Sequence, residues 1–259
     1  MNTPRPAPDR SAAPGPVGEA AVGEAAALVS CAGVAHTYGS GRTAVVAVHD
    51  VSCRVLPTTR VAITGPSGSG KSTLLHLMAG LETVTAGVLS WPGLNGHPLA
   101  HPGRVGIVFQ GPSMLPALDA LENVEFPLLL AGIPDHRARE LARGAMHRLG
   151  ITDLAGQLPQ ELSAGQAQRV AVARALAGGP VLILADEPTG QLDHHAAAHV
   201  VDALLQAADE FGAALLISTH DPVIAARLPQ RWTMADGRLL GPALNPMATA
   251  EPARTGGRP

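Results

Sequence analysis

Residues 65–73 read Gly65-Pro66-Ser67-Gly68-Ser69-Gly70-Lys71-Ser72-Thr73 and match the pattern G-x-x-x-x-G-K-[ST]. The apolar run 61–64 precedes this segment, and a helix-like segment, residues 74–79, follows it. A strand, a glycine-rich loop and a helix in this order are typical of a phosphate-binding loop. The sequence therefore predicts a nucleotide site at residues 65–73.

The residue types in this loop suit phosphate binding. Glycines adopt the positive φ angles that turn successive backbone N–H groups toward one anion, and the helix that follows adds its positive N-terminal end. Lys71 supplies a mobile charge for phosphate oxygens, and the Ser72 hydroxyl is placed to ligate Mg²⁺. Lys71 is the only lysine among the 18 basic residues, which indicates a position where the guanidinium of arginine would not fit.

Composition limits the class of protein. A chain of 259 residues can form one core with insertions or two domains. A net charge of −3 argues against a general nucleic-acid binder. Cys31 and Cys53 lie outside any C-x-x-C spacing, so we expect reduced thiols. No apolar run approaches the roughly 20 residues of a membrane span, and the start lacks the pattern of a signal peptide, so we expect a soluble, unexported chain.

Short β-like runs come before the phosphate loop. Residues 28–31, 45–48 and 51–56 are separated by glycines and Asp50, which predicts an antiparallel sheet. Tyr38, the only tyrosine, lies beside a glycine turn in this region. Its ring could stack on a nucleotide base, although a half-buried loop tyrosine explains it equally well from the residues alone.

The middle of the chain changes from a strand to helices. Residues 105–109 form a strand candidate that ends at Gln110, and residues 115–150 have helical character. A further helix is expected at residues 167–177. Ser163 and Gln166 before it form S-x-x-Q, a capping box that also has a purely structural explanation.

Two apolar runs that predict buried strands are each followed by titratable residues. The apolar run 181–185 ends in Asp186 and Glu187, and the run 213–219 ends in His220. Because ligand chemistry in open α/β sheets lies at the carboxyl ends of parallel strands, these side chains are expected at one edge. Residues 231–240 predict a closing hairpin.

In this order the motifs resemble those of the ATP-binding subunit of an ABC transporter over residues 28–240. The resemblance implies an α/β P-loop NTPase core of mostly parallel sheet flanked by helices, with an N-terminal antiparallel β-subdomain and an inserted α-helical subdomain. The ATPase domain would cover residues 25–240, with the core at 28–110 and 180–240 and the helical subdomain at 111–179. Residues 1–24 and 241–259 are expected to be disordered tails.

The resemblance also implies roles for single residues. Tyr38 would stack on adenine, and the phosphate loop, residues 65–73, would hold the triphosphate. Glu187 would be the catalytic carboxylate, with His220 reading the γ-phosphate and Gln110 sensing the attacking water. Mg²⁺ would be held by Ser72, Gln110 and Asp186. The segment that resembles the family signature, and would act on ATP held by a second subunit, is Leu162-Ser163-Ala164-Gly165-Gln166. Leu192 and Asp193 resemble the loop that crosses the dimer interface.

The sequence departs from the family pattern in three places. Ala164 stands in the signature where glycine is usual, which we expect to weaken dimer closure. Residues 190–193 are a mild variant of the interface segment. The turn at residues 57–60 lacks the usual glycine and acid, which we expect to be harmless.

The resemblance implies that the functional unit is a homodimer, or a dimer with a close homologue, that binds ATP and Mg²⁺. Residues 115–130 and 185–190 look most like the lipoprotein-release and macrolide-export group, so the permease would be a separate membrane protein. Its coupling helix would dock near residues 110–118, where Met114, Leu115 and Leu118 look exposed. The ATPase would then be peripheral on the inner face of the plasma membrane.

Two other functions are possible for a chain with these motifs. One is a regulatory ABC ATPase that signals through a membrane partner without moving cargo, as cell-division relatives do. The other is a soluble ABC protein of translation or DNA repair. A single nucleotide core, no long heptad insertion and no basic tract count against the second of these. Cargo and direction of transport do not follow from the sequence.

Overall fold

The computed structural model describes residues 27–111 and 113–244. The expected tail at residues 1–24, and residues 245–259 of the other tail, lie outside these ranges. Residues 241–244 do not belong to a tail, because strand β9 (Arg238–Leu244) continues through them and pairs with β8 (Gln230–Ala235). The hairpin at Asp236 and Gly237 is therefore confirmed and is longer than expected.

A mostly parallel six-stranded sheet has the order β5-β6-β7-β3-β8-β9, in which only β8 and β9 pair antiparallel. Alternate residues of its central strands face opposite sides: Leu182 and Leu184 of β6 belong to one core cluster, and Ile183 belongs to the other. Both faces are covered, which explains the continuous apolar runs. Besides β8, the parallel strands are β3 (Arg60–Thr64), β5 (Val105–Val108), β6 (Leu182–Asp186) and β7 (Ala214–Ser218), with β5 at one edge of the sheet.

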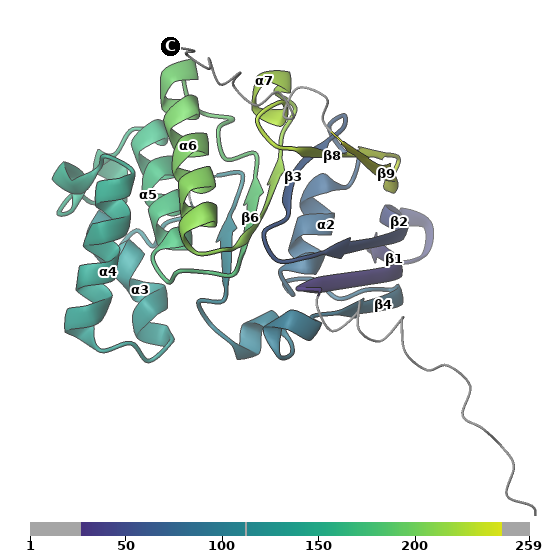
Figure 1. Ribbon diagram of the computed structural model, residues 1–259, viewed down its shortest axis with the longest axis horizontal. Helices are drawn as coiled ribbons and strands as arrows, with labels where there is room; N and C mark the ends of the chain where they lie inside the picture. Colours follow the sequence, from purple (N-terminus) through teal and green to yellow (C-terminus); the bar gives the residue numbers. More distant parts are fainter. Residues whose placement is uncertain (1–26, 112, 245–259) are drawn as a thin grey trace, which may run out of the picture.

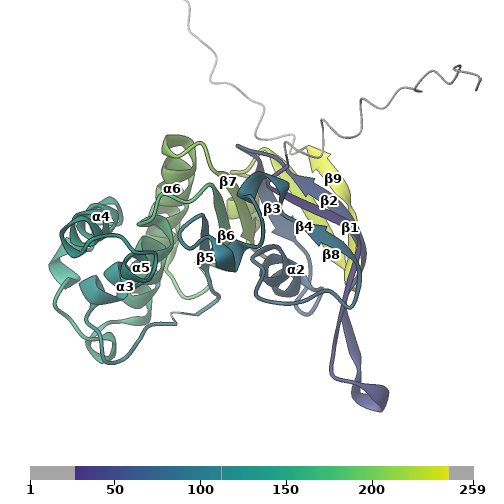
Figure 2. The same cartoon turned by 90° about the horizontal axis from the view of Figure 1, so that it is seen from below.

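A separate three-stranded antiparallel sheet, ordered β2-β1-β4, packs on one side of this core with helix α2 (Lys71–Met78) (Figure 1). Its strands are β1 (Val29–Tyr38), β2 (Val45–Val55) and β4 (Ala86–Ser90). The runs 45–48 and 51–56, expected as two strands, form one strand because β2 passes through Asp50 with a φ of 54°. Figure 2 shows the purple connection between β1 and β2 projecting from the molecule.

Helices cover the opposite face of the parallel sheet (Figure 1). Capping boxes begin two of them, at Asp119 before α3 and at Ser163 before α5. α5 starts at Ala164, three residues earlier than expected, so Ser163 is its N-cap and the last three signature-like residues, 164–166, lie in its first turn. The helices on this side are α3 (Ala120–Leu130), α4 (Asp135–Arg148), α5 (Ala164–Leu176), α6 (His194–Glu210) and α7 (Pro222–Ala225). Short 3-10 helices are η1 (Gly41–Thr43), η2 (Pro92–Leu94), η3 (Pro98–Ala100), η4 (Thr152–Leu154) and η5 (Pro159–Glu161).

Cys31 and Cys53 are both free and lie directly opposite each other on β1 and β2. A hydrogen bond from Cys31 and burial raise the pKa of Cys53 far above its usual range. A thiol held in its neutral form is a poor nucleophile. This agrees with the expectation of reduced structural thiols.

Within the described ranges, no helix combines the length and apolar character needed to cross a bilayer. The fold class expected from the resemblance is confirmed. The sheet of mostly parallel strands, the N-terminal antiparallel sheet and the helical layer are all present.

The turn before β3 predicts a stabilising substitution. Thr59 N donates to Leu56 O at 3.2 Å, and Thr58 between them has a φ of 61°, a region that disfavours a β-branched residue. Thr58→Gly should raise the free energy of unfolding by about 1 kcal/mol in urea titrations. Thr59→Gly is the control and should lower it, because Thr59 Oγ1 accepts from Leu56 N at 3.1 Å. Equal destabilisation by both changes would contradict the strain argument.

Candidate nucleotide site

The phosphate loop joins the carboxyl end of β3 to the start of α2. Gly65, Gly68 and Gly70 have φ angles of 150°, 76° and 96°. A Cβ atom at Gly70 would collide with the carbonyl oxygen of Ala47, and one at Gly65 would collide with that of Met234. Gly65 and Gly70 are therefore required by close backbone packing as well as by conformation, whereas Gly68 is required by conformation alone.

Lys71 is held inside the loop. The residue is 7% exposed, and its Nζ donates to Gly65 O at 3.0 Å and to Pro66 O at 2.9 Å. An ammonium group has three N–H donors, so these bonds fix the side chain without using all of them. The charge thus lies at the centre of the loop, at the N-terminus of α2.

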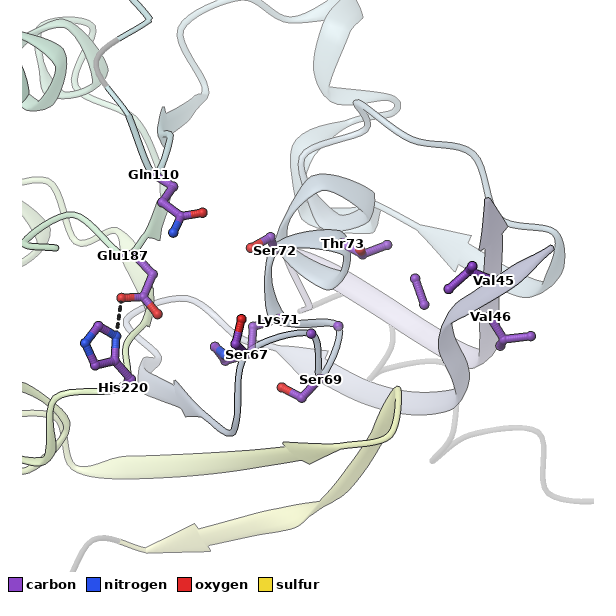
Figure 3. Close-up of a pocket in the computed structure, with 13 residues that line it drawn as sticks. Val45, Val46, Ser67, Ser69, Lys71, Ser72, Thr73, Gln110, Glu187 and His220 are labelled. Atoms are coloured by element: carbon purple, nitrogen blue, oxygen red, sulfur yellow. Dashed lines mark hydrogen bonds and ion pairs between the residues drawn. The ribbon is translucent and has the colours of Figure 1, made fainter. Parts of the chain in front are cut away.

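A cavity of about 520 Å³ lies over this loop, and Figure 3 shows the side chains around it. Gln110, Glu187 and His220 face the phosphate loop across the cavity. They follow the carboxyl ends of β5, β6 and β7, so parallel strands bring together residues that are far apart in sequence. The lining residues are Val45, Val46, Ala47, Ser67, Gly68, Ser69, Gly70, Lys71, Ser72, Thr73, Gln110, Glu187 and His220.

Glu187 and His220 form a close pair. His220 Nδ1 lies 2.6 Å from Glu187 Oε2. The glutamate side chain is 13% exposed and that of the histidine is 72% exposed. Glu187 also has a φ of 46°, a backbone conformation that is rare in most of a protein and occurs more often at functional sites. The pair leaves one carboxylate oxygen of Glu187 for a water molecule or a substrate.

Ser218, which the sequence reading did not select, organises the two acids. It is fully buried, and its Oγ donates to Asp186 Oδ1 at 2.5 Å. The same hydroxyl accepts from Glu187 N at 3.0 Å. Ser218 could have been recognised in the sequence as a polar residue at the end of an otherwise apolar strand.

Val45, Val46 and Ala47 of β2 also line the cavity and were not singled out, because small apolar residues on a strand carry no chemical signal. Tyr38 does not line the cavity, but it is the cross-strand partner of Val45, which does. The tyrosine is 40% exposed. It therefore lies at the border of the site.

The signature-like segment lies in a different place. Ser163, Gly165 and Gln166 share a groove of about 230 Å³ with Leu192 and Asp193. None of these residues lines the cavity over the phosphate loop. Leu162 packs against the helical core, and Ala164 is exposed.

Asp193 has a structural task in this groove. Its Oδ1 accepts from Ala196 N at 2.8 Å and caps α6. This bond lowers the pKa of Asp193. The acid is thus held in its ionised form beside the N-terminus of α5.

The donors near the phosphate loop suit a hard cation. Ser72, Gln110 and Asp186 offer hydroxyl, amide and carboxylate oxygens, the ligands that Mg²⁺ prefers. Asp186 is 4% exposed, and its Oδ1 already accepts from Ser218. Its second carboxylate oxygen is left for an ion or for water that surrounds one.

Comparisons with known proteins identify a matching family and several relatives. Residues 48–190 match the model of the ABC transporter family. The lipoprotein-releasing system ATP-binding protein LolD of Hyphomonas neptunium is 36% identical over 215 residues, which cover 80% of this chain and 94% of LolD. The macrolide export ATP-binding/permease protein MacB 1 of Yersinia pestis is 40% identical over 222 residues, 83% of this chain and 34% of MacB. The chain thus spans about a third of the macrolide exporters' length.

A solved structure is similar in fold. The ATP-binding cassette MJ0796, in a dimeric post-hydrolysis state bound to ADP and phosphate, superimposes with a TM-score of 0.78 at 32% identity. The match covers 83% of this chain and 98% of that protein.

Because the hydroxyl of Ser218 is buried, we expect its removal to lower the free energy of unfolding substantially. Ser218→Ala would leave the buried Asp186 carboxylate without a donor and should lower the free energy of unfolding by about 1–3 kcal/mol in urea titrations. Ser52→Ala is the matched control, because Ser52 Oγ accepts from Gly33 N at 2.9 Å in an exposed position. The control should cost less than about 1 kcal/mol. A loss no larger than that of the control would show that the buried link is unimportant.

Proposed function

The chain belongs to the ABC transporter family, and from that membership we propose that it is the ATP-hydrolysing subunit of a transporter and works as a dimer. The observation that carries the proposal is the meeting of the phosphate loop, Gln110, Glu187 and His220 at one cavity. A regulatory role without transport has no support of its own among the described residues. LolD and MacB, two of the relatives, are named for release and export.

Binding of ATP would use the loop as a cradle. Backbone N–H groups of residues 65–73 and the ammonium of Lys71 would hold the β- and γ-phosphates. Tyr38 would stack on adenine beside Val45. Ser72, Gln110 and Asp186 would hold Mg²⁺, which when bound neutralises charge on the phosphate oxygens.

Hydrolysis would require a water molecule aligned with the γ-phosphorus and one general base. A water oxygen adds to the γ-phosphorus, the bond to the β,γ-bridging oxygen breaks, and ADP and phosphate leave. Glu187 would orient this water and accept its proton, while His220 Nδ1 holds the other oxygen of the carboxylate at 2.6 Å. Gln110 faces the same cavity and would contact the water or the γ-phosphate.

A second copy would complete each site. Residues 162–166 and Leu192-Asp193 share a groove that lies apart from the phosphate-loop cavity of their own chain. The N-terminus of α5, fixed by the Ser163 capping box, would supply N–H groups to the γ-phosphate bound by the partner copy. MJ0796, the similar cassette, is dimeric.

Residues 28–110 and 180–240 would act as the nucleotide core, and 111–179 as a helical subdomain that carries the signature. The permease would dock near residues 110–118 and hold the ATPase at the inner face of the membrane. Asn123, 1% exposed, donates to Leu115 O at 3.1 Å and to Leu118 O at 2.8 Å. These bonds hold the backbone of residues 115–118 in one conformation. Leu115 is 40% exposed, as expected. Met114 and Leu118 are half-buried, contrary to their expected exposure, and Met114 packs against the helical core.

Glu187→Gln should bind ATP normally and hydrolyse it at least about a hundredfold more slowly, because the amide cannot take a proton. Phosphate release measured at saturating ATP and Mg²⁺ tests this. Glu210→Gln, at an exposed ion pair with Arg148, is the control and should keep full turnover. Wild-type turnover in Glu187→Gln would remove that residue from the proposed role.

Leu115→Glu should abolish copurification with the permease and leave the ATPase activity of the isolated chain unchanged. Charge in an apolar contact carries a desolvation penalty that the partner cannot offset. Val223→Glu is the control, since Val223 is 71% exposed on α7. Copurification should be measured from membranes that contain both proteins. Undiminished recovery of Leu115→Glu would refute docking at this loop.

A further inference from the structure

His36 is a buried histidine outside the reaction chemistry described above. It lies on β1, is 6% exposed, and pairs across the sheet with the fully buried Val48. Its Nδ1 lies 2.7 Å from Thr83 O, so the ring donates an N–H to that carbonyl. Glu82 Oε2 lies 3.8 Å from Nε2. Nε2 is buried and makes no hydrogen bond to any described residue, so the bond from Nδ1 to the Thr83 carbonyl is what fixes the orientation of the imidazole.

The same ring touches Tyr38. The two ring centroids are 4.4 Å apart and the planes are at 78°, an edge-to-face contact. Aromatic pairs favour this geometry, which fixes one ring relative to the other. Tyr38 follows His36 by two residues, so both side chains lie on the same side of the strand. An exposed tyrosine therefore stands on a buried, hydrogen-bonded support.

His36 and its strand contact the segment that follows helix α2. Thr83 lies in the segment after α2, the helix that begins with Lys71. Thr85 N in the same segment donates to Ala35 O at 2.8 Å, so β1 contacts the segment at neighbouring residues. The strand that carries His36 and Tyr38 is thus hydrogen-bonded to the segment that follows the C-terminal end of α2, the helix that begins at the phosphate loop.

We infer that His36 is a positioning residue for ATP, which sets the orientation of the Tyr38 ring against adenine through their edge-to-face contact. The inference rests on the proposed stacking of adenine on Tyr38. It gives a role to a polar group buried at the edge of the site, where an aliphatic side chain would fill the space without directing the tyrosine.

A comparison of two ligands tests this inference. MgATP carries a base, whereas the magnesium complex of inorganic tripolyphosphate engages only the phosphate loop. His36→Leu should raise the Kd for MgATP by about three- to tenfold in calorimetry. It should leave the Kd for tripolyphosphate and kcat at saturating ATP unchanged. His36→Phe, which keeps an aromatic edge, should bind ATP more tightly than His36→Leu.

The background of Tyr38→Ala supplies the decisive control. In it, His36→Leu should cause no further loss of ATP affinity, because the ring that it positions is gone. The inference is overturned if His36→Leu weakens both ligands equally, if it has its full effect without Tyr38, or if it has no effect. Unchanged ATP affinity in Tyr38→Ala alone would instead refute the proposed stacking, and the inference with it.

Discussion

The site depends on the parallel alignment of four neighbouring strands. β3, β5, β6 and β7 end at one edge of the sheet, and each is followed there by a functional side chain or by the phosphate loop. Parallel pairing brings these ends together although they are far apart in the sequence. The apolar residues of these strands, buried on both faces of the sheet, supply the rigidity that places the polar groups.

A few polar contacts at this edge of the sheet depend on that rigidity. Ser218 holds Asp186 through its hydroxyl and fixes the backbone of Glu187, whose φ of 46° would be unfavourable without such support. His220 then fixes the carboxylate itself. A buried strand end therefore determines where the base of the proposed reaction points.

The sequence predicted most of this arrangement, because its signals are local. The phosphate loop, the acids after β6 and the capping box at Ser163 each depend on residues next to one another in the chain. The contributions of Ser218 and of Val45 to Ala47 depend on strand register, which no local pattern gives. The extension of β9 through residues 241–244 has the same cause, since pairing with β8 outweighs a Gly-Pro sequence that suggests a tail.

The separation of the two groups of predicted site residues is the central feature, because under the proposed function it makes a single chain incomplete. Mixing two inactive variants tests it most directly. Lys71→Ala would keep an intact signature, and Ser163→Arg, at an exposed position, would keep an intact phosphate loop. If sites form between copies, the mixture should hydrolyse ATP although neither variant does so alone. Activity of the mixture no greater than the sum of the separate variants would contradict the account.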